Sequence, residues 1–452
     1  MSLTHRRVPR ALSKRTMLVC IAALIAVLAA ACGSSSGGGS SGSSHITLTI
    51  LFHSQDSPLQ KAFERQTLIQ GFEKAHPNIT VDATWTANPR DVIVQQLAAG
   101  GGPDILITDG SADVQYFAQQ KQVLPLTKWE NQYGWNTLYP SWAMPLLSFN
   151  GTMYAIPNKT DILVMYYNKN IFAQHGWSPP TTWSQLLQVS AEAKKAGLQA
   201  FALGTSDIPN ANEWWITAAI NDTLGATGTK QLLSGQIPWN GPQVTSAISA
   251  LKQLWDDGYL NSGEAAGITL NEATSEFLDQ KSAMLLEGTW ELGSLVADPP
   301  GFNYGVLEIP AFNSAVQPDL PLAVGQTMLI NKYTKNPDAA AEFLAWVGSA
   351  ENLNKALEPV GIPTLADLSI AKLAAVNPNY ATVGQFYSAA SSSGNLGYAS
   401  WSYFPATLRT WMMTALDEVY DGQMSVSAYV DKLESLYQAS VANGSYTLFK
   451  NG

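Results

Sequence analysis

The chain has 452 residues, which at roughly 100 to 200 residues per domain is enough for two or three domains. Hydrophobic residues make up 46 % of it, which excludes intrinsic disorder and collagen-like structure. Five of the 25 basic residues lie in the first fifteen positions and no acidic residue precedes Asp56, so the remaining chain has 20 basic and 35 acidic residues, a formal charge of −15. Such a body repels phosphate backbones and anionic lipid, and we expect no nucleic-acid binding.

Residues 1–31 are predicted to be a lipoprotein signal peptide. Their basic start precedes fifteen uncharged, mostly apolar residues, Met17 to Ala31, whereas a membrane-spanning helix needs about 20. Leu28 to Cys32 resembles a bacterial lipobox, in which cleavage occurs before a diacylated cysteine, although Ala29 stands where a branched residue is usual. The other cysteine, Cys20, lies inside the leader, so the mature chain has one thiol and no internal disulfide. We expect lipidation at Cys32 and an anchor on the outer face of the cell membrane; plain secretion is the alternative.

Residues 32–45 are predicted to be an acylated cysteine followed by a tether. Positions 33–44 contain only Gly and Ser, a flexible composition with a root-mean-square span of about 20 Å. The GxGxxG and GxSxG patterns inside this tract lack the strand and helix that give such motifs meaning, so we discard them.

From residue 46 onward, short β-rich runs alternate with helical stretches. The pattern predicts a strand at 46–53, a helix at 59–75, a strand at 79–85, a helix at 90–99 and a buried strand at 104–107. This βαβαβ order begins an open, largely parallel sheet, whose ligands collect at the carboxyl ends of the strands. Those ends are His53, Trp85 and residues 108–110.

A second block repeats this alternation. We predict strands at 160–168, 198–204 and 282–287, and helices at 182–196, 212–221, 243–257, 270–280, 337–349, 405–420 and 426–442. No second flexible linker separates the blocks, which favours two lobes joined by several short crossings that act as a hinge.

Several stretches of the sequence carry a family resemblance. They are GFEKAHPNITVDATW (71–85), GGPDILITDG (101–110), the run from GTMYAIPNKT through PPTTWSQLL (151–187), FLDQKSAMLLEGTWELGSL (277–295) and INKYTKNPDAAAEFLAWV (330–347). Together they resemble the bacterial extracellular solute-binding proteins of carbohydrate ABC importers, the group that includes maltose-binding protein. Gln280 and Val324-Gly325 depart from the family pattern, which commonly has Gly at the first position and a Gly pair at the second.

The resemblance implies an α/β, two-lobed, type II periplasmic-binding-protein-like fold, with a mostly parallel sheet flanked by helices in each lobe. Residues 46–158 with 326–365 would form the N-lobe and residues 159–325 with 366–452 the C-lobe, with crossings near 158–163, 321–326 and 361–367. It implies a monomeric, extracytoplasmic substrate-binding lipoprotein that needs no cofactor or metal. Such a protein binds a neutral sugar or oligosaccharide between its lobes and delivers it to the ABC permease subunits.

A sugar presents flat apolar faces and a rim of hydroxyls, so its binder needs aromatic platforms. Trp290 occupies the place where the family stacks a sugar ring. Trp214 and Trp215 are adjacent and point about 100° apart on a helix, so one is expected in the core and the other towards the cleft. Trp401 lies in an aromatic loop and is a further candidate.

The hydroxyl rim needs planar hydrogen-bonding side chains. Asp109 ends the third predicted strand, Asp161 lies just past the first crossing, and Glu287 flanks Trp290. A cap, turn or salt-bridge role is the alternative for each carboxylate. Position at a strand end or a crossing adds His53, Trp85 and Gln326.

Other functions stay open as alternatives. The same importer class could take a polyol or a glycerophosphodiester, but only three arginines follow the leader, which disfavours an anionic ligand. A tethered glycoside-active enzyme would share the leader, as would an adhesin or a structural lipoprotein. The chain has no HExxH or CxxC metal motif and no Walker A sequence, which disfavours metalloenzyme and nucleotide chemistry.

Overall fold

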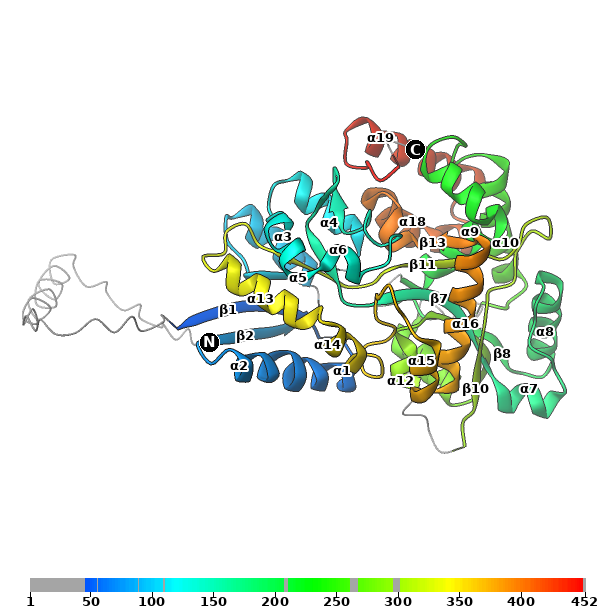
Figure 1. Ribbon diagram of the computed structural model, residues 1–452. Coiled ribbons are helices and arrows are strands. Elements are labelled where there is room, and N and C mark those ends of the chain that lie inside the picture. Colours follow the sequence, from blue (N-terminus) through cyan, green and yellow to red (C-terminus); the bar gives the residue numbers. More distant parts are fainter. Residues whose placement is uncertain are drawn as a thin grey trace, which may run out of the picture. The chain divides into compact units, whose positions relative to one another are not determined.

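Two β-sheets organise the part of the chain that the structure describes (Figure 1). The structure is a computed structural model, and it describes residues 45–449 apart from positions 55, 88, 109, 207–209, 261–266 and 296–300. The predicted signal peptide, Cys32, the Gly/Ser tether and Asp109 lie outside the described residues.

Sheet 1 has the strand order β2-β1-β3-β12-β6. β1 runs parallel to β2 and β3, as the βαβαβ pattern predicts, whereas β12 runs antiparallel to both β3 and β6. The sheet that begins the chain therefore contains a strand from a distant segment. The bounds are β1 (Ile46–His53), β2 (Ile79–Thr86), β3 (Ile105–Thr108), β6 (Ala155–Pro157) and β12 (Thr327–Ile330).

Sheet 2 has the order β13-β11-β7-β9-β8, with β10 also paired to β7. β7 is antiparallel to β9, β10 and β11, and the parallel pairs are β8–β9 and β11–β13. The two-lobed α/β class holds, but sheet 2 is mixed rather than mostly parallel, because its central strand enters from the other lobe and runs opposite to its neighbours. The bounds are β7 (Thr160–Asn168), β8 (Gln199–Ala202), β9 (Ser282–Gly288), β10 (Tyr304–Leu307), β11 (Leu320–Val324) and β13 (Leu396–Tyr398).

Lobe 1 is the part of the chain that packs on sheet 1. Here α3 packs on β1 and β3, and α13 packs on β1 and β12, although α13 lies far along the chain (Figure 1). The elements are α1 (Pro58–Phe63), a π-helical segment (Glu64–Gln70), α2 (Gly71–Ala75), α3 (Pro89–Ala98), α4 (Ser111–Gln119), α5 (Thr127–Tyr133), α6 (Trp135–Leu138), the β4–β5 hairpin (Ser148–Phe149, Thr152–Met153), α13 (Pro337–Val347) and α14 (Ala350–Lys355).

Lobe 2 is the part that packs on sheet 2. Here α9 packs on β9, β11 and β13, and α16 packs on β10, β11 and β13. The helices are α7 (Lys169–His175), α8 (Trp183–Lys195), α9 (Asn210–Leu233), α10 (Pro242–Asp256), α11 (Leu270–Leu278), α12 (Glu291–Leu295), α15 (Ile370–Val376), α16 (Pro378–Ser393), α17 (Ser400–Tyr403), α18 (Ala406–Tyr420) and α19 (Val426–Ala442).

Local sequence explains where several helices begin. Thr269 and Glu272 form a reciprocal capping box at the start of α11. The hydroxyl of Ser57 accepts the N–H of Gln60 at 3.1 Å before α1. Proline occupies the first turn of α10, α13 and α16, where its missing N–H costs no helical hydrogen bond.

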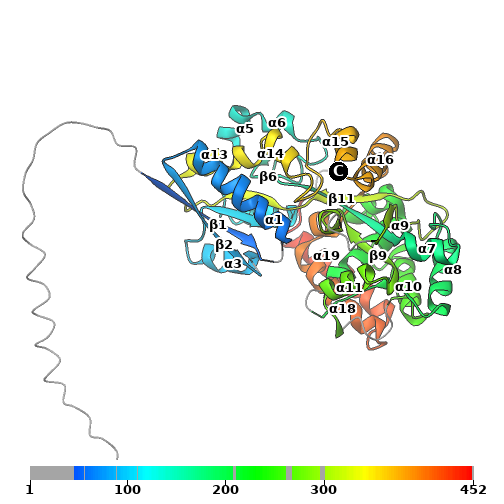
Figure 2. The same cartoon turned by 90° about the horizontal axis from the view of Figure 1, so that it is seen from below.

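The chain passes between the sheets in segments that are hydrogen-bonded to one another. Asn158 N–H donates to the Gln326 carbonyl at 3.0 Å, which joins the segment between β6 and β7 to the segment between β11 and β12. Thr160 N–H donates to the Ile362 carbonyl at 2.7 Å, which adds the segment between α14 on lobe 1 and α15 on lobe 2 (Figure 2). Three short, adjacent segments thus form the hinge region, in place of a flexible linker.

Both sheets turn the carboxyl ends of most of their strands towards these crossings. β12 begins at a crossing and runs antiparallel to β3, so β1, β2 and β3 all end at that edge of sheet 1. β7 begins at a crossing, so its antiparallel neighbours β9 and β11 end there, together with β8 and β13. Of the predicted site residues, Trp290, Trp401 and Gln326 follow such strand ends, and His53, Trp85 and Glu287 are the last or next-to-last residues of their strands.

Candidate functional site

Three tryptophans from separate segments of lobe 2 meet beyond the end of β9. Trp290 follows β9, and its ring centroid lies 5.3 Å from that of Trp214 in α9 and 5.6 Å from that of Trp401 in α17. Trp214 and Trp401 are 5 % and 6 % exposed, whereas Trp290 is only partly buried. We call these three residues the tryptophan cluster; Trp290 is its accessible member.

Glu287 is hydrogen-bonded to the tryptophan cluster. Trp290 Nε1 donates to Glu287 Oε2 at 2.8 Å, and the Glu287 side chain is completely buried in β9. Burial, and to a lesser degree the carboxylate of Glu291, raises the pKa of Glu287 well above its usual value. Its other oxygen, Oε1, has no hydrogen-bond partner among the described residues. The raised pKa favours the neutral form of the carboxyl group, which lies at the N–H edge of the indole.

Gly288 provides the space that the Trp290 ring occupies. A Cβ atom at Gly288 would lie 2.0 Å from Cζ3 of Trp290, so the indole folds back against the backbone of β9. The Gly288 carbonyl also accepts the hydroxyl of buried Tyr166 at 2.9 Å. The close approach of ring and backbone requires glycine at this position.

The tryptophan cluster reaches lobe 1 at the turn between β3 and α4. Gly110 has φ +106°, and a Cβ atom there would lie 3.1 Å from the Trp401 carbonyl and 2.7 Å from the Ser402 hydroxyl. Ser111 N–H donates to Ser402 Oγ at 3.4 Å. The indole Nε1 of Trp401 is buried and has no acceptor among the described residues. The two lobes thus meet beside this buried donor.

Trp85 belongs to a separate arrangement in lobe 1. Its ring stacks on Phe52, with centroids 5.4 Å apart at 17°, and the guanidinium of Arg65 lies 4.3 Å from its centroid. Its Nε1 donates to Glu64 Oε2 at 2.8 Å. Trp85 is therefore fixed within lobe 1 and does not join the tryptophan cluster.

Glu64 continues into a polar network that reaches the crossings. The side chain is 3 % exposed and accepts the Gln60 amide at 3.2 Å; burial, followed by the nearby Asp56 carboxylate, raises its pKa to about 8. Gln326 Nε2 donates to Asp56 Oδ1 at 3.4 Å, and Asn158 Nδ2 donates to Gln326 Oε1 at 3.2 Å. Gln326 thus lies between the two crossings and lobe 1. The burial of Glu64 was not predicted from the sequence. Its position four residues before the apolar Leu68, on the same helix face, is the signal that indicates it.

Trp215 and His53 also lie apart from the tryptophan cluster. Trp215 is 1 % exposed and packs edge-on against Phe201 in the core of lobe 2, with centroids 4.9 Å apart. This agrees with the expectation that neighbouring tryptophans on a helix point in different directions, and it takes Trp215 out of the platform. His53 ends β1 in register with Thr86 and is partly buried.

Asp161 lies near the start of β7, just past the first crossing. Its Oδ1 is 3.7 Å from Lys159 Nζ, and both side chains are at most 10 % exposed. A Cβ atom at Gly325 would lie 2.3 Å from Asp161 Oδ2, so the second crossing makes room for this carboxylate. Gly325, the one glycine of the Val324-Gly325 pair that replaces the family's frequent glycine pair, therefore has a steric role in the hinge region.

The arginines after the leader, Arg65, Arg90 and Arg409, all have partners. Arg65 lies over the Trp85 ring. Arg90 Nε donates to Asp113 Oδ1 at 2.7 Å, and Arg409 makes a two-point contact with buried Glu213. Carboxylates thus occupy the guanidinium groups of Arg90 and Arg409, whereas the contact of Arg65 is with an aromatic ring.

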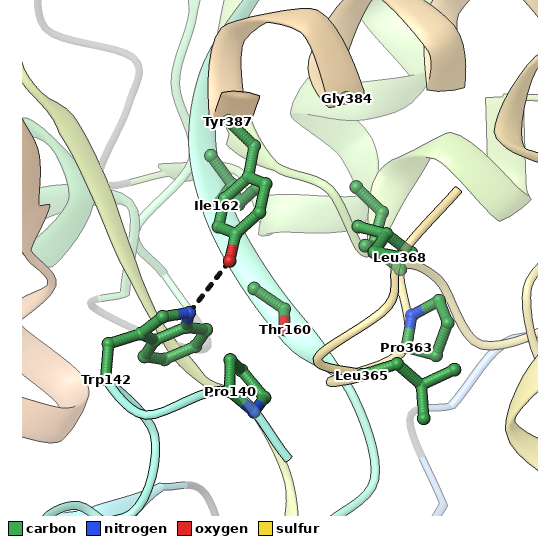
Figure 3. Close-up of a pocket in the computed structure, with 10 residues that line it drawn as sticks. Pro140, Trp142, Thr160, Ile162, Pro363, Leu365, Leu368, Gly384 and Tyr387 are labelled. Atoms are coloured by element: carbon green, nitrogen blue, oxygen red, sulfur yellow. Dashed lines mark hydrogen bonds between the residues drawn. The ribbon is translucent and has the colours of Figure 1, made fainter. Parts of the chain in front are cut away.

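One enclosed cavity lies beside the crossings (Figure 3). Its volume is about 10 Å³, room for about one water molecule. Trp142 of lobe 1 donates across it to the Tyr387 hydroxyl of lobe 2 at 3.0 Å, next to Thr160 and Pro363. This cavity is too small for a sugar. A larger hollow, between His76, Tyr133 and Trp346 on lobe 1, contains none of the predicted site residues.

Two features of the described residues bear on function. These residues contain no group of three or more His, Cys, Asp or Glu side chains placed to hold a metal ion. Within the same residues, no helix has the length and apolar character needed to cross a membrane.

Comparison with known proteins agrees with this architecture. The profile of the family described as "Bacterial extracellular solute-binding protein" matches residues 52–353. The chain belongs to this family. Its relatives are substrate-binding proteins of ABC transporters and not enzymes, and they include proteins named for sugars.

Individual relatives are distant in sequence. The chain is 24 % identical to the multiple sugar-binding protein of Streptococcus mutans, covering 75 % of this chain and 83 % of that one. It is 25 % identical to the mannitol-binding protein of Pseudomonas aeruginosa, covering 63 % and 65 %. A solved chitin oligosaccharide binding protein, 21 % identical, superposes with a TM-score of 0.74 over 87 % of this chain and 99 % of that one. Maltose-bound MalE3 of T. maritima, 16 % identical, gives 0.72 over the same shares. These superpositions establish the two-lobed type II fold.

Proposed function

We propose that this solute-binding protein takes a neutral sugar or oligosaccharide between its lobes, with Trp290 as a stacking platform, and delivers it to the permease of an ABC importer. The tryptophan cluster carries this proposal. A partly exposed indole backed by two buried ones offers a rigid apolar face that suits the flat C–H face of a pyranose. The Trp401 Nε1, which has no acceptor among the described residues, lies beside it and suits a ligand with hydroxyl groups.

Charge supports a neutral ligand. The arginines have partners within the protein, and the chain after the leader has a formal charge of −15. A phosphodiester would meet a repulsive field, and the guanidinium groups of Arg90 and Arg409 are already paired with carboxylates. The names of the relatives point the same way, towards sugars in Streptococcus mutans and a polyol in Pseudomonas aeruginosa. Asp109 remains a candidate for binding hydroxyls, since it precedes Gly110 in the chain.

The same proposal includes an anchor at Cys32, and action as a monomer at the outer face of the cell membrane. The lipobox-like sequence and the Gly/Ser tether support this placement. A tether of this kind keeps a binding protein near its permease while leaving its lobes free to move.

Calorimetric titration with mono-, di- and oligosaccharides, mannitol and a glycerophosphodiester tests the proposal. We expect a neutral saccharide to bind tightest, and Trp290→Ala to weaken it by about 1 to 3 kcal/mol, or about 5- to 150-fold in Kd, by analogy with other ring stacking on aromatic side chains. Trp183→Ala is the matched control. That tryptophan is also partly buried in lobe 2 but packs on Phe312, 4.0 Å away between centroids, so affinity should not change. Tightest binding of the phosphodiester would overturn the ligand class.

A further inference from the structure

We propose that Glu287 is a positioning residue, whose buried carboxyl group sets the orientation of the Trp290 indole so that its free face can receive the ligand. This inference rests on the proposed function and adds a residue that need not touch the sugar. It assigns to Glu287 a different role from the direct hydroxyl contact that its sequence position suggests.

The contact is both directional and protected from water. Glu287 Oε2 lies 2.8 Å from Trp290 Nε1, and the Glu287 side chain has no exposed surface. Within the described residues this is the one hydrogen bond of the Trp290 side chain. The other neighbours of the ring, Trp214, Trp401 and the backbone at Gly288, restrict it by packing alone. A hydrogen bond from the indole N–H defines the rotation of the ring in its own plane, which packing against apolar surfaces specifies only weakly.

The protonation of Glu287 fits this role. Burial raises the pKa of Glu287 well above its usual value, which favours a neutral carboxyl group as the acceptor of the indole N–H at the edge of the ring. The groups that influence it are Glu291, which raises the pKa, and the Trp290 N–H and Gly288 N–H, which lower it. Glutamine has nearly the same shape and a carbonyl acceptor, and it is therefore the conservative replacement.

Lobe 1 contains the same pair in a different setting. Trp85 Nε1 donates to buried Glu64 at the same distance of 2.8 Å, but there Phe52 and Arg65 lie against the indole ring. Two contacts besides the carboxyl group therefore restrict the Trp85 ring. Glu64 thus offers a matched control, with the same chemistry and burial outside the tryptophan cluster.

Three variants test the inference. Glu287→Met keeps the volume but removes the acceptor, and should weaken saccharide binding by about three- to tenfold, the range expected for the net effect of one hydrogen bond. Glu287→Gln keeps the acceptor and should bind within about twofold of the parent protein. Glu64→Met should lower the midpoint of thermal unfolding, with the affinity per folded molecule unchanged. In a Trp290→Phe background, which has no indole N–H, Glu287→Met should have no further effect on affinity.

A ligand-independent readout separates this inference from the proposed function. The ¹⁵N–¹H resonance of the Trp290 indole, assigned by its loss in Trp290→Phe, should exchange slowly with solvent in the parent protein and in Glu287→Gln, and faster in Glu287→Met. If the exchange changes as expected while Glu287→Met binds saccharide as the parent does, the positioning role is wrong and the proposed function stands. Equal losses in Glu287→Gln and Glu287→Met would also overturn it, because the acceptor would not be the important feature. If no saccharide binds the parent protein, the proposed function fails and the positioning role fails with it.

Discussion

Removing the guanidinium of Arg409 should destabilise the folded protein by about 3 to 5 kcal/mol, because it leaves a buried carboxylate without its counter-charge. Arg409, in α18, donates from Nε to Glu213 Oε1 at 2.5 Å and from Nη2 to Oε2 at 2.9 Å. Glu213, in α9, is 1 % exposed. In the Arg409→Met variant, the side-chain donor that Glu213 keeps among the described contacts is the Ser400 hydroxyl, at 2.6 Å.

The structure places the expected loss near the lower end of that range. The Arg409 side chain is 21 % exposed, so water can enter on its side and solvate part of the carboxylate that remains. Urea unfolding followed by tryptophan fluorescence measures the effect. Lys252→Met is the control, since Lys252 pairs with Asp256 on an exposed helix surface and its loss should cost at most about 1 kcal/mol.

A second substitution distinguishes an unpaired charge from lost packing. The double variant Glu213→Leu/Arg409→Met removes both charges, and it should recover most of the stability that Arg409→Met loses. A loss below about 1 kcal/mol in Arg409→Met, or a double variant as unstable as the single one, would refute the reasoning. The pair also matters for the site, because Glu213 precedes Trp214 and Ser400 precedes Trp401 in the chain.

Three further predictions concern the crossings, pH and the anchor. Gly325→Ala should destabilise the protein by about 1 to 3 kcal/mol, because the new Cβ would overlap the Asp161 carboxylate. Gly101→Ala is the control and should not destabilise it, since the nearest neighbouring atom to a Cβ there is 3.9 Å away. Equal thermal unfolding midpoints for the two variants would contradict this prediction. Glu64 has a folded-state pKa of about 8 and a reference value of 4.5, so the folded state binds the extra proton and stability should fall as pH rises from about 4.5 to about 8. Glu64→Gln should reduce that loss of stability. Parallel curves of unfolding free energy against pH for the parent protein and Glu64→Gln would show that Glu64 is not the titrating group. Cys32→Ala should move the protein from the membrane fraction to the medium, and unchanged membrane retention would remove the lipoprotein proposal.

Local sequence patterns determined much of the lobe architecture. The strand predicted at 46–53, the strand at 160–168 and the helix at 426–442 have the bounds that the structure assigns to β1, β7 and α19. These segments are long and strongly patterned, so each specifies its own conformation. The ordered series of motifs likewise sufficed for the family, since the profile match covers the same stretch of chain.

Pairing between distant segments decided the rest of the fold. β11 and β12 are short, are buried along their whole length and were not predicted, because three to five apolar residues in a row have no period that separates strand from helix. Their directions, and hence the mixed character of sheet 2, depend on where the chain crosses between lobes. The predicted helix at 59–75 forms, but it contains a π-helical segment that its apolar pattern does not reveal.

The sequence by itself predicted the candidate residues of the site, but only the tertiary structure decided which of them lie in contact. Trp214, Trp290 and Trp401 are far apart along the chain and come together because α9, β9 and α17 converge at one edge of sheet 2. Trp85, an equally reasonable candidate by position, is held instead by Phe52 and Arg65. Contacts of this kind depend on packing between distant elements, which local residue patterns do not encode. Residue type and spacing therefore predicted an aromatic sugar platform, but they did not specify its geometry.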